Sequence, residues 1–120
     1  MRGGTLDLER KLALKGRSLE VRGAPCGLSF PGRKGGSSER ALLVFVTNRA
    51  SLGTARRAVV ESASADRLTW VAYPKAGQLG TDLNRDSLAE RLRKEGIQPV
   101  TQIAIDETWS ALRFRPAKPT

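Results

Sequence analysis

The chain has 120 residues, 39% of them hydrophobic and 28% charged, values typical of one soluble globular domain with a single core. It contains 21 Lys and Arg, 12 Asp and Glu, and no histidine. Without histidine, the chain cannot use Ser-His-Asp or Cys-His nucleophile activation or zinc sites built from His and Cys. Cys26 is the only cysteine, which excludes an intramolecular disulfide and favours a cytoplasmic location.

The sequence predicts neither a membrane span nor a signal peptide. The longest apolar run covers residues 41–46, which is far too short to cross a bilayer, and charges at residues 7–11 interrupt any apolar stretch near the start. The net charge of +9 is uneven, because residues 1–60 hold 12 Lys and Arg against 4 Asp and Glu. We interpret this excess as an aid to solubility, the alternative being a surface that attracts anions.

The first third of the chain predicts one helix, one strand and one long loop. The helix covers residues 5–16, with Thr5 as its cap. The strand SLEVRGAP follows and ends at Gly23 and Pro25. Residues 27–40 predict a flexible loop rich in Gly, Ser and basic residues. Its GRKGGSS stretch lacks the residue order of a phosphate-binding P-loop, so a contact with an anion is the minor alternative.

Two buried strands separated by a helix come next. ALLVFVTN, at 41–48, is apolar on both faces, which is typical of a central parallel strand. A helix over 51–64 has apolar residues at helical spacing, with Ser51 as its predicted N-cap. RLTWVAYP, at 67–74, predicts the second buried strand.

The last third predicts a helix and two strands. The helix ends at Gly96 and places Leu88 and Leu92 inward. PVTQIAID, at 99–106, predicts a third interior strand, and the alternation in ALRFRP predicts an antiparallel edge strand joined to it by a hairpin. Arg113 and Arg115 would then face solvent on that edge, and residues 117–120 are expected to fray.

This order of elements predicts an α/β domain over residues 1–120. We expect an open, mostly parallel, Rossmann-like sheet of about five strands, with helices on both faces and an antiparallel C-terminal edge strand. Right-handed crossovers would bring the carboxyl ends of the parallel strands to one edge, where such folds bind ligands. The backbone after Tyr73 and the backbone at Asp106 should therefore leave neighbouring parallel strands.

Three motifs, YPK at 73–75, TDLNRD at 81–86 and DETWSALRFRP at 106–116, carry a resemblance to a known family. The stretch from Ala41 to Pro116 resembles an uncharacterised bacterial family, a domain of unknown function whose members look like reduced class I methyltransferase-type Rossmann domains. The resemblance implies a fold and no activity. The chain departs from methyltransferases at RGAPCGL, where the cofactor-binding turn would lie, and it has no place for a ribose-binding acid. We therefore expect neither methyl transfer nor a bound cofactor.

The expected ligand-binding edge gathers polar residues from several loops. Lys75, Arg85 and the start of the following helix could bind a phosphate or carboxylate. In the structural alternative, Asp82, Asp86 or Thr81 caps that helix and the cations pair with acids, including a link between Lys75 and Asp106. The tentative ligand-binding residues, none of them catalytic and none a metal ligand, are Tyr73, Lys75, Thr81, Asp82, Asn84, Arg85, Asp106 and Trp109.

Trp109 is the most unusual residue of the predicted hairpin turn. We expect it to cover the end of the core beside Tyr73, and the alternative is a stacking platform for a ligand or a partner. Ser110 has no histidine base, so we expect it to be no nucleophile. Cys26 lacks an obvious activating cation beyond Arg22, so we expect an inert thiol.

Three functions remain open. The first is a non-catalytic module that binds a protein partner or forms a homodimer, with Lys75, Asp82 and Asp106 mutually satisfied and no deep pocket. The second is a binder of a small anion or nucleotide, which needs an open pocket at the sheet edge with Lys75, Arg85 and Trp109. Nonspecific nucleic-acid binding through the basic first half is the weakest, because few aromatic residues remain for stacking.

Overall fold

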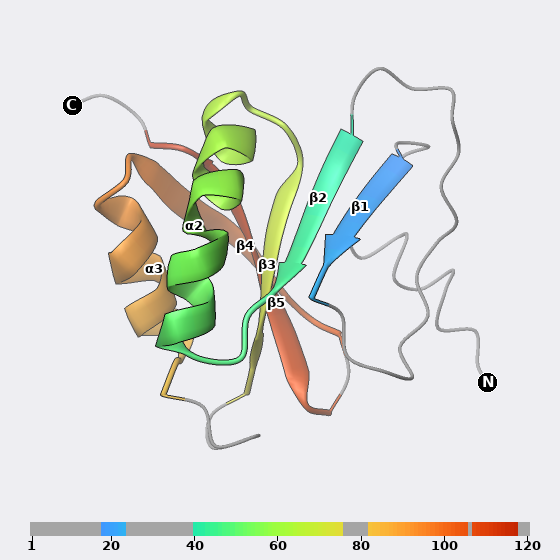
Figure 1. Cartoon of the computed structure of the whole chain (residues 1–120), viewed down its shortest axis with the longest axis vertical. Coiled ribbons are helices and arrows are strands. Elements are labelled where there is room, and N and C mark those ends of the chain that lie inside the picture. The colour runs from blue at the N-terminus through green and yellow to red at the C-terminus, as the bar shows by residue number, and fades with distance from the viewer. Residues whose placement is uncertain (1–17, 24–39, 76–81, 106, 118–120) are drawn as a thin grey trace.

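A computed structural model of the chain describes residues 18–23, 40–75, 82–105 and 107–117. The predicted helix at 5–16 and almost all of the loop at 27–40 lie outside these ranges. The elements are β1 (Ser18–Arg22), β2 (Arg40–Phe45), α2 (Arg49–Ser64), β3 (Thr69–Pro74), α3 (Arg85–Arg93), β4 (Ile97–Ala104) and β5 (Trp109–Pro116) (Figure 1).

The described strands form one mixed five-stranded sheet in the order β1-β2-β3-β5-β4. β1, β2 and β3 are parallel neighbours, with Leu43 opposite Trp70 in the register of β2 and β3. β5 is antiparallel to both β3 and β4. The α/β class and the five strands are therefore confirmed. The expectation of a mostly parallel sheet is wrong, because only two of the four neighbouring pairs are parallel.

The positions predicted for the last two strands are reversed. β5 lies between β3 and β4, and β4 forms the edge of the described sheet. β5 is buried on both faces, since Ala111 is inaccessible on one face and Phe114 on the other. In β4, by contrast, only Ile97 is buried. Pro99 is the sequence feature that indicates an edge strand. A proline has no backbone N–H and so cannot donate a hydrogen bond to a neighbouring strand.

This strand order separates two points that were expected to be adjacent. β4 runs in the same direction as β3, but β5 stands between them. Lys75, the residue that follows β3, therefore meets the β4–β5 connection, where its amide donates a hydrogen bond of 2.7 Å to the Thr108 carbonyl oxygen. Asp106 itself lies outside the described residues.

Both described helices pack on the same face of the sheet (Figure 1). Leu52 and Val59 of α2 and Leu88 and Leu92 of α3, all buried, share one core with β-strand residues such as Leu112. The inward orientation predicted for Leu88 and Leu92 is confirmed. The opposite face has a second buried cluster, made by Ala41, Leu43, Phe45, Leu68, Trp70, Ala72, Trp109 and Ala111. The structure therefore does not confirm the predicted helices on both faces, because the helices within the described ranges cover one face only.

Both helices begin with the same four-residue pattern, Asn-Arg-x-Ser. Asn48 caps α2 and Asn84 caps α3, and each asparagine side chain accepts a hydrogen bond from the backbone N–H of the serine three residues later. The serine hydroxyl accepts in return from the asparagine N–H, completing a capping box. Ser51 is therefore the third residue of α2 and not its N-cap, and neither Asp82 nor Asp86 caps α3.

Arg113 and Arg115 do not lie on a free edge, because β5 is an interior strand. The Arg113 side chain is half-buried. Arg115 pairs with Asp66 through two contacts, of 3.1 Å from Nε to Oδ1 and 3.2 Å from Nη2 to Oδ2. The side chains of both arginines therefore make contacts within the fold.

Amide hydrogen exchange distinguishes the observed strand order from the predicted one. β5 has hydrogen-bonded neighbours on both sides, so all its amides should exchange slowly. Alternate amides of β4 face the free edge and should exchange fast. Residue-resolved exchange followed by NMR measures both strands. An alternating pattern in β5 with uniform protection in β4 would contradict this topology.

Candidate functional site

A pocket of about 420 Å³ lies where the end of β3, the start of α3 and the last two strands meet. Four of the predicted ligand-binding residues, Tyr73, Lys75, Asn84 and Arg85, line it together. Asp86, Gln102 and Ser110 complete the lining. The pocket therefore lies at the carboxyl end of the central strand β3, as expected for a ligand site in an α/β sheet.

Tyr73 supplies a buried hydroxyl at the floor of this pocket. Its side chain is only 3% exposed, and its oxygen accepts a hydrogen bond of 3.1 Å from Nε2 of Gln102. Burial raises the pKa of the Tyr73 phenol above its ordinary value, and the opposing effects of Arg85 and of a hydrogen bond with Ser110 do not cancel this rise. The phenol is therefore neutral at physiological pH and serves as a hydrogen-bonding group, not as a base.

Two cations flank the hydroxyl. Lys75 follows β3 and is half-buried, and within the described ranges no carboxylate lies at ion-pair distance from it. Arg85 is the first residue of α3, and its side chain is 59% exposed. Arg85 makes a long contact of 3.4 Å with Asp86, whose own side chain is 87% exposed. Such an exposed pair is weak, so Arg85 can still bind another anion.

Asp82 belongs to the scaffold and not to the pocket. Its Oδ1 accepts a hydrogen bond of 2.8 Å from the backbone N–H of Arg49, the first residue of α2. This bond satisfies one of the helix's unpaired first amides and ties the segment before α3 to the start of α2. Thr81 and Asp106 lie outside the described residues, as does the predicted link between Lys75 and Asp106.

Trp109 lies on the other face of the sheet. Its side chain is 5% exposed and belongs to the cluster that contains Phe45, while Tyr73 belongs to the cluster under the helices. The two rings of Phe45 and Trp109 meet edge to face, with centroids 4.9 Å apart. Trp109 thus packs in the core, as expected, but the expectation that it lies beside Tyr73 is wrong, because the two side chains are on opposite faces of the sheet. Trp109 does not line the pocket.

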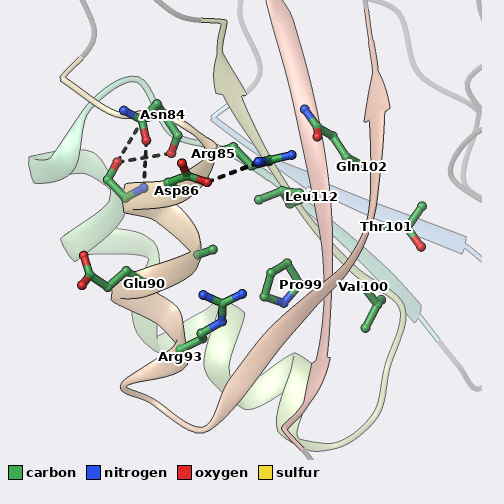
Figure 2. A pocket seen from close by; sticks show the side chains of 12 residues that line it. Asn84, Arg85, Asp86, Glu90, Arg93, Pro99, Val100, Thr101, Gln102 and Leu112 are labelled. Carbon is green, nitrogen blue, oxygen red and sulfur yellow. Dashed lines mark hydrogen bonds and ion pairs between the residues drawn. The ribbon is translucent and has the colours of Figure 1, made fainter.

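A second cavity, of about 740 Å³, continues from the pocket along α3 (Figure 2). It shares Asn84, Arg85, Asp86 and Gln102 with the pocket. Its walls are one side of α3 and strand β4, and Leu112 of β5 lies between them. We call this cavity the α3–β4 groove. The sequence does not predict Gln102 and Ser110 as site residues, because their contact with Tyr73 depends on the position of β5.

The described residues contain neither a candidate metal cluster nor a candidate membrane-spanning helix. No group of three or more His, Cys, Asp or Glu side chains in these ranges could hold a metal ion. Neither described helix is long and apolar enough to span a membrane.

No protein-family model, curated protein or solved structure matches the chain. The pocket is therefore the feature of the structure that bears on function. Two cations and several polar hydrogen-bonding groups around a buried phenol form an arrangement that suits a small anion.

Titration of Tyr73 tests the burial of the pocket floor. It is the only tyrosine in the chain, so the phenolate absorbance reports on this residue alone. We expect the pKa of Tyr73 in the folded protein to lie above the ordinary value of about 10 for tyrosine. The raised pKa contributes stability below pH 10, which is lost as the pH rises through the folded pKa. Ultraviolet titration and alkaline denaturation measure both effects, and Tyr73→Phe should abolish the signal. Titration at or below the ordinary value would contradict a buried phenol.

Replacement of Asp82 tests its assignment to the scaffold. Asp82→Ala should lower the free energy of unfolding by about 1 kcal/mol, because the Arg49 amide loses its capping partner. Chemical denaturation measures this change. Glu107→Ala is the control, since Glu107 is also an exposed acid and has no hydrogen bond or ion pair within the described ranges. Equal stabilities of the two variants would remove the structural role of Asp82.

Proposed function

We propose that the protein is a small Rossmann-like module that binds a small anion, a phosphate or carboxylate group, without catalysing its conversion. The supporting observation is the meeting of Lys75, Arg85 and the buried Tyr73 hydroxyl in one pocket at the carboxyl end of β3. Lys75 has no carboxylate partner in the described part of the chain, so a ligand can supply the missing negative charge. Trp109 has no part in this proposal.

The electrostatics of the pocket favour an anion. Lys75 and Arg85 contribute two positive charges, against one negative charge from Asp86. α3 begins at Arg85, so the positive end of its dipole and the N–H groups of its first turn also face this region. At an effective dielectric constant of about 20, one opposite charge about 4 Å away contributes roughly 4 kcal/mol before desolvation is subtracted.

Polar side chains add specificity to this attraction. Ser110 is 6% exposed, and its hydroxyl and the Gln102 amide both contact the Tyr73 phenol. This hydrogen-bonded set is held by three adjacent strands, so its geometry is rigid. A planar carboxylate or a tetrahedral phosphate can accept hydrogen bonds from such groups while its charge pairs with Lys75 and Arg85.

The same pocket argues against catalysis. The chain has no histidine, and the partner of Ser110 in the pocket is the neutral Tyr73 phenol, which cannot remove its proton. Asp86, the carboxylate that lines the pocket, is 87% exposed and already contacts Arg85. Binding without turnover is therefore the function that these groups support.

The pocket supports the second of the functions that the sequence leaves open. The interaction-module hypothesis requires Lys75 and Asp82 to be mutually satisfied, whereas Asp82 bonds to the Arg49 amide. An open pocket at the strand ends is what the anion hypothesis requires. The parallel β2–α2–β3 unit supports a Rossmann-like origin, and the relation to the uncharacterised family of methyltransferase-like domains remains a proposal.

Binding of defined anions tests the function. Isothermal titration with inorganic phosphate, pyrophosphate and citrate should detect binding of at least one of them. Lys75→Met and Arg85→Gln should each weaken it about tenfold, because a charge-assisted hydrogen bond contributes roughly 1.5–3 kcal/mol. Asp86→Asn should strengthen it, since a repelling charge is removed.

Arg91→Gln is the matched control, because Arg91 lies on the same helix but does not line the pocket. The proposal fails if none of the three anions binds at low salt, or if Arg91→Gln weakens binding as much as Arg85→Gln does.

A further inference from the structure

The α3–β4 groove has an arginine at each end (Figure 2). Arg85 is the first residue of α3 and Arg93 is the last, and both line the groove. Both side chains point from the helix toward the strands, and the Arg93 guanidinium extends toward Pro99 of β4 (Figure 2). At a rise of about 1.5 Å per residue, the two positions lie about 12 Å apart along the helix axis.

The wall between the two arginines is apolar. Pro99 of β4 and Leu112 of β5 line the groove between the two arginine side chains (Figure 2). Ala89 lies midway along α3 and lines the same groove. A surface of this kind offers no hydrogen bond and suits the hydrocarbon part of a ligand.

Arg93 is exposed, and no carboxylate lies at ion-pair distance from it in the described part of the chain. Of the two acids in the groove, Asp86 contacts Arg85 at 3.4 Å, and the Glu90 side chain points away from β4 (Figure 2). Glu95, beyond the end of α3, pairs with an arginine of α2 at 2.9 Å. Arg93 is therefore available to an anionic group of a ligand.

We propose that the ligand of this site is an elongated molecule with an anionic group at each end and an apolar middle, an inference that rests on the proposed function. One carboxylate or phosphate occupies the pocket, where Lys75 and Arg85 bind it. The other meets Arg93 at the far end of the α3–β4 groove. The groove shares Arg85 with the pocket, so one molecule can occupy both.

The acids of the groove oppose negative charge in the middle of such a ligand. Asp86 and Glu90 lie on α3 between Arg85 and Arg93. A polyanion of the same length would carry negative charge past both acids, and like charges repel. A hydrocarbon chain avoids this repulsion and contacts the apolar wall instead. The distribution of charge along the groove therefore favours two separated anionic groups.

Isothermal titration with three carboxylates tests the proposal. Decanedioate has two carboxylates joined by a hydrocarbon chain of about the required length. Decanoate has the same chain with one carboxylate, and succinate has two carboxylates that are close together. We expect decanedioate to bind at least about tenfold more tightly than either, because its second carboxylate forms a charge-assisted hydrogen bond with Arg93. An analogue of equal length with ether oxygens in its chain should bind more weakly than decanedioate.

Substitution of Arg93 tests the second anchor. Arg93→Gln should lower the affinity for decanedioate to that for decanoate. Arg91→Gln is the matched control and should retain the advantage of decanedioate, because Arg91 is an exposed arginine of the same helix that does not line the groove. Thermal melting of both variants checks that the fold is retained. An advantage that persists in Arg93→Gln, or that Arg91→Gln also removes, would overturn the role of Arg93.

The affinity of the unaltered protein for inorganic phosphate separates this proposal from the proposed function. Binding of phosphate with no advantage of decanedioate over succinate and decanoate overturns the elongated ligand alone. Failure of both phosphate and decanedioate to bind at low salt overturns the two proposals together. Equal affinities for decanedioate and its ether analogue would overturn the apolar middle of the ligand.

Discussion

The antiparallel pairing of β5 with β3 determines most of this structure. It runs from Thr69 opposite Phe114 to Pro74 opposite Trp109. Because β5 occupies the position next to β3, β4 is displaced to the edge of the described sheet. The same pairing places Ser110 opposite Tyr73. The pocket and the free edge are therefore two consequences of one strand arrangement.

The floor of the pocket is rigid because strands form it, and one wall is formed by the first residues of α3. Tyr73, Ser110 and Gln102 come from the three strands β3, β5 and β4, and they hydrogen-bond across the sheet. Arg85 comes from α3, whose position is fixed by the burial of Leu88 and Leu92 and, through Asp82, by the start of α2. Arg85 is thus placed by the core under the helices.

Local sequence predicts the elements well and their neighbours poorly. Periodicity places Leu88 and Leu92 inward, and the apolar run at 41–46 marks a central strand, because each depends only on residues close in the chain. The order of β4 and β5 depends on which strand of the hairpin pairs with β3. Both orders use the same turn and bury similar side chains of β5, so the alternation in ALRFRP fits either. Only Pro99 and the polar residues of β4 favour the edge.

The same reason explains which site residues the sequence predicted. Tyr73, Lys75 and Arg85 flank a single connection, from β3 to α3, so their proximity follows from the chain itself. Gln102 and Ser110 reach the pocket only because β5 lies beside β3. Trp109 was included among the tentative ligand-binding residues because a tryptophan is unusual in a predicted hairpin turn at the ligand-binding edge. Side chains alternate along a strand, however, and this places Trp109 on the opposite face.

The charges in the described part of the chain support the view that the pocket needs a ligand from outside. Most acidic side chains there are already engaged, each with an arginine side chain or, for Asp82, a backbone amide; they are Glu20, Glu61, Asp66, Asp82, Asp86 and Glu95. These exposed pairs add little stability individually, but they leave few carboxylates to neutralise Lys75. An external anion can neutralise it, at a position where a helix start and the Tyr73 hydroxyl add to the attraction.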